Sequence, residues 1–413
     1  MSAEASCAYN ESVSLELDGP LDLQAMRHTI ERLVQRHESL RTVFDSTGMR
    51  VVVFDRLDIP LEIHDLSDRS DAESGTERTR IGRTLMTSPF DLLHGPLFRA
   101  VLFNLGKDQH VLRLVGHHAV CDGWSLGILM ADISRIYSAL LEEKEPELPE
   151  AIPHSRYAEA INTFYRSGEN EQVKRYWKEL FAEPIPRVDL PTDHPRPAEK
   201  TWTATRLDIP MDLALITGLK QVATRYGSSF VTTLLSVYEV LIARITGQRD
   251  LVIGLPAAGQ SDMGMKDLVG HCVSLLPLRT VIDDELPFHE YLEGTTQNGA
   301  RRLRPPTLHL QHPVAGVERA ARARSRSTGP GHLQYRYEHG RWRGLHRSGP
   351  SILQRSTGIR TVRAHHERVR LRGPHGDGMV LQCGPVRGAH GARMDEGSHR
   401  TGGTREQGSG NTP

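Results

Sequence analysis

The sequence has few cysteines and lacks a long apolar segment. Its four cysteines (Cys7, Cys121, Cys272 and Cys383) are scattered without paired spacing, so neither a zinc site nor a disulfide framework is predicted. No run of about 18 apolar residues occurs, and the N-terminus lacks the pattern of a signal peptide. These absences argue against a secreted or membrane-spanning protein. We therefore expect a chain that works in a reducing cytoplasm, with no membrane partner.

Lysine and phenylalanine are both absent after residue 300, and this divides the chain. Residues 1–300 hold 30 Lys and Arg against 44 Asp and Glu, whereas residues 301–413 hold 21 Arg, no Lys and 7 Asp and Glu. The two segments carry opposite balances of −14 and +14, which cancel in the net charge of zero. The second segment also loses the apolar periodicity that helices and strands need. One interpretation is an arginine-rich tail that binds nucleic acid.

Two adjacent histidines stand where a predicted strand gives way to a predicted helix. Residues 110–115 alternate as a buried strand, and apolar residues recur at helical spacing over residues 126–141. Neighbouring side chains point in opposite directions at a strand end. Only one of His117 and His118 can therefore readily face a cavity, and the other should hold the loop.

The residues that follow decide between packing and chemistry. A lone histidine at a strand end is more often packed than catalytic, and an aspartate there can simply cap the next helix. His117, His118, Asp122 and Gly123 together form His-His-x-x-x-Asp-Gly. This spacing resembles the core motif of the condensation domains of nonribosomal peptide synthetases. That family belongs to the acyltransferases similar to chloramphenicol acetyltransferase.

A second match strengthens the resemblance. Residues 36–44 fit the family pattern Arg-His-Glu-x-Leu-Arg-Thr-x-Phe at every fixed position, although a charged helix end is usually just a solvated face. The resemblance implies that an arginine of this motif pairs with the motif aspartate. We therefore expect Arg41, or alternatively Arg36, to form an ion pair with Asp122.

Further matches lie in the second half of the chain. Residues 270–279 resemble Gly-x-x-Val-Asn-x-Leu-Pro-Leu-Arg, with Ser274 in place of the usual Asn; the family carries this motif where the chain crosses between two lobes. His271 within it is expected only to pack, because nothing nearby in the sequence offers it a partner. Residues 155–160 match another family segment weakly.

The resemblance covers residues 8–298 and implies an α/β, two-lobed chloramphenicol acetyltransferase-like fold with an incomplete second lobe. We expect the N-terminal lobe, with the histidine motif, over residues 1–168. The C-terminal lobe should begin over residues 169–300, after which the tail follows. His118 is expected to face the cleft between the lobes. A proline-rich linker is expected over residues 184–200.

A shifted reading frame explains the tail better than nucleic-acid binding does. Residues 301–312 can be written with codons that, in the adjacent frame, spell Asp-Ala-Tyr-Asp-His-Gln-His-Tyr-Thr-Phe-Ser-Thr. That string resembles what a condensation domain carries after its crossing motif. We therefore expect residues 301–413 to be an out-of-frame, disordered tail rich in Arg, Gly and Pro, unable to bury enough apolar surface to offset chain entropy.

The resemblance implies amide formation by acyl transfer. The amine of an acceptor aminoacyl thioester attacks a donor acyl thioester, and phosphopantetheine arms of partner carrier domains deliver both, so the chain itself holds no cofactor or metal. By motif position His118 accepts a proton or positions the amine, for which an imidazole is suited near neutrality. His117 supports the loop, Asp122 keeps the motif in shape, and Gly123 leaves room for the arm.

An adenylation domain or polyketide synthase modules are expected beside the carrier domains, and nucleic acid is not an expected partner.

Other functions remain open. A coenzyme A-dependent acyltransferase would share the histidine chemistry, and an epimerisation domain would keep both histidines. Heterocyclisation is disfavoured because its motif replaces the histidines with aspartate. An inactive pseudogene remnant is the alternative from outside enzymology.

Overall fold

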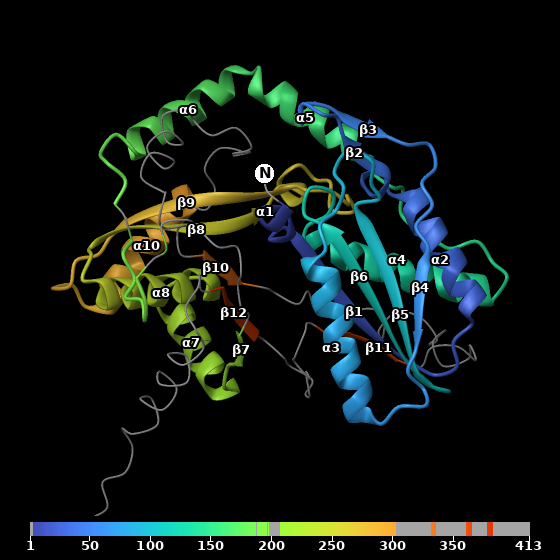
Figure 1. Cartoon of the computed structure of the whole chain (residues 1–413). Helices are drawn as coiled ribbons and strands as arrows, with labels where there is room; N and C mark the ends of the chain where they lie inside the picture. Colours follow the sequence, from blue (N-terminus) through green and yellow to red (C-terminus); the bar gives the residue numbers. More distant parts are fainter. Residues whose placement is uncertain are drawn as a thin grey trace, which may run out of the picture.

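Two sheets, each accompanied by helices, lie beside one another in the computed structural model (Figure 1). The structure describes residues 3–186, 188–195, 197 and 207–302, with three short strands at 332–335, 361–365 and 378–382. Among these described residues, each large sheet has five strands, and a separate two-stranded sheet accompanies them. This arrangement confirms the α/β architecture with two lobes.

The first lobe is built on a sheet with the strand order β11-β1-β6-β5-β4. The pairs β11–β1, β1–β6 and β6–β5 are antiparallel, whereas β4 is parallel to β5. Alternating apolar residues favour these strands because every second side chain points to the same face of a sheet. The strands are β1 (Asn10–Asp18), β4 (Leu61–Asp65), β5 (Phe98–Gly106), β6 (Gln109–His117) and β11 (Thr361–His365).

Helices cover both faces of this first sheet. On one face α2 (Leu23–Arg36) and α4 (Gly123–Leu141) pack their apolar stripes against the strands, and on the other α3 (Asp71–Thr87) does so. Burying a large apolar side chain contributes about 1.5–3 kcal/mol. The two clusters therefore hold β6, and the histidines at its end, in place. Their central members are Leu15, Leu33, Leu112 and Leu129 on the first face and Ile81, Phe103 and Val115 on the second.

The second lobe has a sheet with the strand order β7-β12-β10-β8-β9. β8 and β9 are its longest strands and pair antiparallel, with Ile253 opposite Leu278. Their hairpin reaches from the second lobe towards the first (Figure 1). The elements are β7 (Leu207–Pro210), α7 (Leu213–Arg225), α8 (Phe230–Thr246), β8 (Asp250–Ala258), α9 (Gly259–Asp262), β9 (Val273–Val281), α10 (Phe288–Arg302), β10 (His332–Tyr335) and β12 (Gly378–Gln382).

α8 is largely apolar, but it is not buried on all sides. Leu235 and Ile242 are buried in clusters with residues of β8 and β9. On the outer side, Val237 and Leu241 are 41% and 46% exposed. A helix that lies on one sheet presents a single stripe to it. The described residues leave the opposite stripe of α8 uncovered.

The helices α5 and α6 connect the lobes. α5 and α6 run across the top of Figure 1 from the first lobe to the second, and the domain boundary predicted at residue 168 falls at the first residue of α6. The short elements are α1 (Ala3–Cys7), η1 (Glu38–Arg41), β2 (Thr42–Phe44), β3 (Val51–Val53), α5 (His154–Tyr165) and α6 (Gly168–Leu180).

Most of the predicted out-of-frame tail lies outside the described residues. Only β10, β11 and β12 belong to the described part of residues 303–413, so the shifted frame and the disorder stay predictions. Most of the region predicted as a linker, residues 184–200, is described and contains neither helix nor strand.

Within the described part of the chain, no single helix is long and apolar enough to cross a membrane. α7 and α8 pass that test of length and composition only as a pair bent by 104°.

Candidate active site

The histidine motif lies at the end of β6 and the start of α4, as the sequence predicts. His117 is the last residue of β6, and Gly123 is the first residue of α4. Asp122 is the N-cap of that helix: its backbone is extended, and its side chain accepts a hydrogen bond from the Ser125 backbone N–H at 2.8 Å. The turn between strand and helix therefore has a fixed end on each side.

His117 is buried and holds this turn. Its Nδ1 accepts a hydrogen bond from the Ala119 backbone N–H at 3.2 Å, so the proton of the neutral ring is on Nε2. Nε2 lies 3.3 Å from the Ser6 hydroxyl, to which it donates. Burial lowers the pKa of His117, and the neighbouring His118 lowers it further. The ring is thus neutral at physiological pH.

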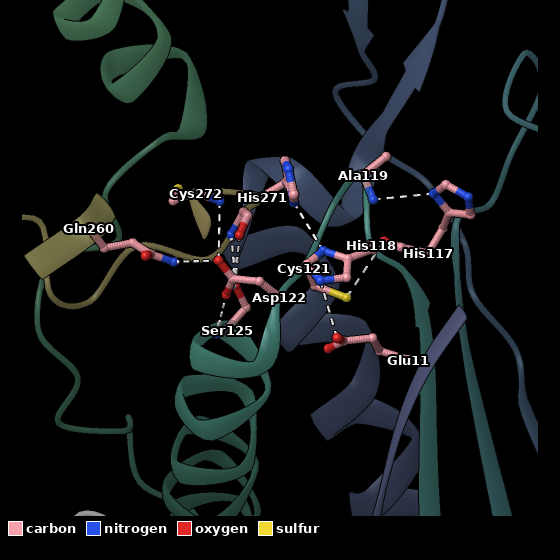
Figure 2. A network of polar contacts seen from close by, with 11 residues as sticks. Glu11, His117, His118, Ala119, Cys121, Asp122, Ser125, Gln260, His271 and Cys272 are labelled. Atoms are coloured by element: carbon pink, nitrogen blue, oxygen red, sulfur yellow. Dashed lines mark hydrogen bonds and ion pairs between the residues drawn. The ribbon is translucent and has the colours of Figure 1, made fainter. Parts of the chain in front are cut away.

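His118 points the other way and lies between two partners from distant parts of the chain (Figure 2). Its Nε2 is 3.1 Å from Glu11 Oε1, and its Nδ1 is 2.9 Å from Nδ1 of His271. The His118 side chain is 21% exposed and that of Glu11 is 27% exposed. Of the two motif histidines, His118 is therefore the one that solvent and a ligand can reach.

The two imidazoles in contact have opposite proton affinities. Burial disfavours a charge on His118, but several contacts outweigh it and raise the pKa of His118 above its usual 6.5. These are first the hydrogen bond and negative charge of Glu11, then a hydrogen bond to the backbone of His118 itself and the charge of Asp122. Burial, and then the neighbouring His118, lower the pKa of His271 to about 4. When this pair carries one positive charge, His118 carries it.

Asp122 is buried and connects α4 to the second lobe. Its Oδ1 accepts from the backbone N–H and the hydroxyl of Ser125, each at 2.8 Å. Its Oδ2 accepts from Gln260 Nε2 at 2.9 Å and from the Cys272 backbone N–H at 3.1 Å. These four hydrogen bonds satisfy a carboxylate that is only 2% exposed.

The predicted ion pair of Asp122 with Arg41 or Arg36 is wrong. Among the described residues, Arg36 donates from Nε to Asp132 Oδ2 at 2.8 Å, and Arg41 Nη1 donates to the backbone carbonyls of Phe54 and Asp55. Arg36 thus ties the end of α2 to α4, whereas Arg41 ties η1 to the residues that follow β3. Asp122 instead uses its oxygens for the helix cap and the crossing segment, so backbone and amide donors replace the expected guanidinium.

The crossing segment, residues 259–273, is built against the motif. Ser125 Oγ donates to the Gly270 carbonyl at 2.9 Å and accepts from the Gly270 N–H at 3.0 Å. Trp124 Nε1 donates to the Lys266 carbonyl at 2.8 Å. A methyl group on Gly270 would lie 2.2 Å from the ring of His154. The first lobe and the crossing segment thus meet within a few ångströms of His118.

Sequence reasoning missed two residues of this site. The expectation that His271 only packs is wrong, since its Nδ1 contacts His118. Glu11 was not singled out because its position depends on strand pairing: the β1–β6 register sets Glu11 opposite Gly116, two residues before His118. The predicted role of Gly123 stays a prediction; it lies beside Asp122 at the start of α4. Glu11, His118 and His271 together can hold a proton at one accessible imidazole. The described residues contain no cluster of His, Cys, Asp or Glu side chains that could hold a metal ion.

Comparison with known families gives one clear match. The family model described as "Condensation domain" matches residues 1–305. The chain is 33% identical over 290 residues to a linear gramicidin synthase of Brevibacillus parabrevis, covering 70% of this chain and 6% of that protein. It is 34% identical over 308 residues to malpibaldin synthetase of Mortierella alpina, covering 73% of this chain and 5% of that protein. The chain thus spans only a small part of the length of these relatives.

Solved structures show the same fold. VibH, described as a condensation enzyme of nonribosomal peptide synthesis, has a TM-score of 0.62 at 20% identity, covering 78% of this chain and 73% of that one. SgcC5 of Streptomyces globisporus has a TM-score of 0.64 at 22% identity, covering 78% of this chain and 72% of that one. At these identities the likeness shows the fold alone.

Proposed function

The chain belongs to the condensation domain family, and on that premise we propose that it joins a donor acyl thioester to the amine of an acceptor aminoacyl thioester. The observation that supports this is the placement of His118. It is a partly exposed imidazole where the first lobe meets the crossing segment, with both ring nitrogens in polar contacts. An imidazole there can take up or position the proton of an attacking amine.

The reaction balances without any further reactant. The amine nitrogen forms a bond to the thioester carbonyl carbon, and the carbon–sulfur bond breaks. The proton released by the amine passes to the His118 imidazole and then to the departing thiolate. Holding the two thioesters side by side also lowers the barrier, because it makes the encounter intramolecular.

The partners we propose are the carrier domains of a nonribosomal peptide synthetase, acting beside an adenylation domain or polyketide synthase modules. Phosphopantetheine arms would deliver both substrates, and the chain itself would hold no cofactor. The much greater length of the relatives supports neighbouring domains of this kind. The free thiols of Cys7, Cys121 and Cys272 fit the cytoplasmic location that we propose.

The deciding experiment is amide formation between two loaded carrier domains, followed by mass spectrometry. It compares the chain as printed, a chain with the reading frame restored after residue 300, and the restored chain carrying His118→Ala. We expect little turnover from the printed chain and clear turnover from the restored one. His118→Ala should lower the restored rate by about 10²–10⁴-fold if general base catalysis contributes its usual share.

Other outcomes would identify other functions. Acylation of a free amine by a coenzyme A thioester, with carrier-bound thioesters left intact, would indicate a coenzyme A-dependent acyltransferase. Inversion at the donor Cα without amide formation would indicate an epimerisation domain. A restored chain that melts cooperatively but does neither would contradict the proposal and indicate an inactive remnant.

A further inference from the structure

The contacts of His118 specify more than its presence in the site. We propose that Glu11 and His271 are positioning residues for His118: Glu11 keeps a proton on Nε2, which leaves Nδ1 as the basic nitrogen, and His271 covers Nδ1 until an acceptor amine displaces it. The consequence for catalysis rests on the proposed function. The arrangement itself rests on the geometry.

Glu11 settles the proton on Nε2. An ionised carboxylate can only accept hydrogen bonds, so Nε2, at 3.1 Å from Glu11 Oε1, carries a hydrogen whether His118 is neutral or charged. A carboxylate on one ring nitrogen selects the tautomer whose other nitrogen is basic, as in hydrolytic triads. Glu11 comes from β1, which is rigidly paired with β6. This pairing holds the carboxylate opposite the ring.

His271 occupies the remaining nitrogen. The two Nδ1 atoms are 2.9 Å apart, and the rings meet edge to face at 79°. One hydrogen must lie between them: it belongs to His118 when that ring is charged and to His271 when both rings are neutral. In either state His271 covers Nδ1 of His118. An acceptor amine that gives its proton to Nδ1 must therefore take the place of the His271 ring.

The other titratable groups around His118 support this assignment. His117 on β6 is neutral and turned away towards Ser6. Asp122 at the start of α4 is negative and favours the charged form of His118. His154 on α5 is buried, which lowers its pKa, so it adds no positive charge near neutrality. Cys121 is fully buried, and burial raises the pKa of its thiol, which stays neutral. Glu11 is thus the only carboxylate that the described residues place on the His118 ring itself.

Two measurements on the whole chain test the proposal. The first is the rate at which diethylpyrocarbonate modifies His118, followed by peptide mapping from pH 5 to pH 8, because this reagent attacks only the unprotonated imidazole. We expect Glu11→Gln to move the midpoint of the His118 profile to lower pH, so that modification near pH 6 becomes several-fold faster. Glu11→Asp should restore most of the native profile. His271→Ala should raise the plateau rate several-fold by uncovering Nδ1.

The matched control is Asp18→Asn, which removes the same charge from the same strand. It lies seven residues from Glu11, about 23 Å at roughly 3.3 Å per residue, and should leave the midpoint unchanged. Each variant is compared only at a melting temperature close to that of the native chain. An unchanged midpoint in Glu11→Gln, or an equal shift in Asp18→Asn, would overturn the role of Glu11. An unchanged plateau in His271→Ala would overturn that of His271.

The second measurement needs no substitution. Long-range ¹H–¹⁵N NMR of the histidine-labelled chain reads the tautomer of His118 directly, above its midpoint. The proposal requires hydrogen on Nε2 and none on Nδ1, and the reverse pattern would overturn it. Neither measurement depends on amide formation. A native tautomer and a shifted midpoint in a restored chain without turnover would sink the proposed function and leave this inference standing.

Discussion

The backbone N–H of Cys272 donates a hydrogen bond of 3.1 Å to Asp122 Oδ2, across 150 residues of sequence. Asp122 belongs to the motif and Cys272 to the crossing segment, so a single buried carboxylate serves both lobes. Its other oxygen caps α4 through Ser125. The motif aspartate is therefore a structural residue here, without any arginine partner among the described residues.

Asp122→Ala should destabilise the chain strongly. Loss of the helix cap costs about 0.5–2 kcal/mol, and leaving the buried donors of Gln260 and Cys272 unpaired adds about 1–3 kcal/mol each. We expect a loss of about 3 kcal/mol or more in urea unfolding. The control is Asp212→Ala, which removes the exposed cap of α7 and should cost about 1 kcal/mol. Equal losses in the two variants would contradict the bridging role of Asp122.

Gly116→Ala should disturb the turn through Cys121. A methyl group there would lie 2.3 Å from Cys121 Sγ, and overpacking of this kind costs about 1–3 kcal/mol. Adding Cys121→Ala should recover part of the loss, which a double-mutant cycle on thermal unfolding would measure. Gly127→Ala on α4, where nothing lies within 4 Å, should instead stabilise by about 0.5–1 kcal/mol. A loss of stability in Gly127→Ala would show that the helix, not the turn, resists substitution.

The Glu11–His118 pair should stabilise the fold at low pH. The pKa of His118 is raised in the folded chain, so the stability that it adds is complete below the unfolded value of about 6.5 and is lost as pH rises through the folded value. Glu11→Gln should therefore cost more at pH 5.5 than at pH 8.5, by about 1 kcal/mol. Urea midpoints at the two pH values check this. A cost that is the same at both would contradict the pairing.

Asp132 should show the opposite dependence on pH. Burial raises the pKa of Asp132, but hydrogen bonds from His37 and Arg36 outweigh it and hold the pKa below 3.8. The stability from this carboxylate is complete above the unfolded value of about 3.9 and is lost as pH falls through the lower folded value. Asp132→Asn should cost about 3–5 kcal/mol at pH 7, because a buried pair is broken. Unfolding at pH 7, 5 and 3.5 should show equal costs at the first two values and a smaller cost at the last.

The sequence predicts local structure here better than side-chain contacts. The strand before His117 and the helix after Asp122 follow from apolar spacing, because each period reflects a few neighbouring residues. The partners of His118 are different, since Glu11 is brought there by strand register and His271 by a chain crossing 153 residues away. The pairing expected for Asp122 failed for the same reason. Arg36 is instead paired with Asp132, a buried residue of α4.

The hydrogen bonds that tie the crossing segment to Asp122 and Ser125 have a mechanical consequence. Any motion of one lobe against the other that preserves these bonds must be a rotation about an axis through this junction. Atoms near a rotation axis move little, so the surroundings of His118 would stay constant while the far ends of the two sheets move apart. Substrates delivered on carrier arms, as proposed above, could then enter and leave with different acyl loads without disturbing the proton on His118.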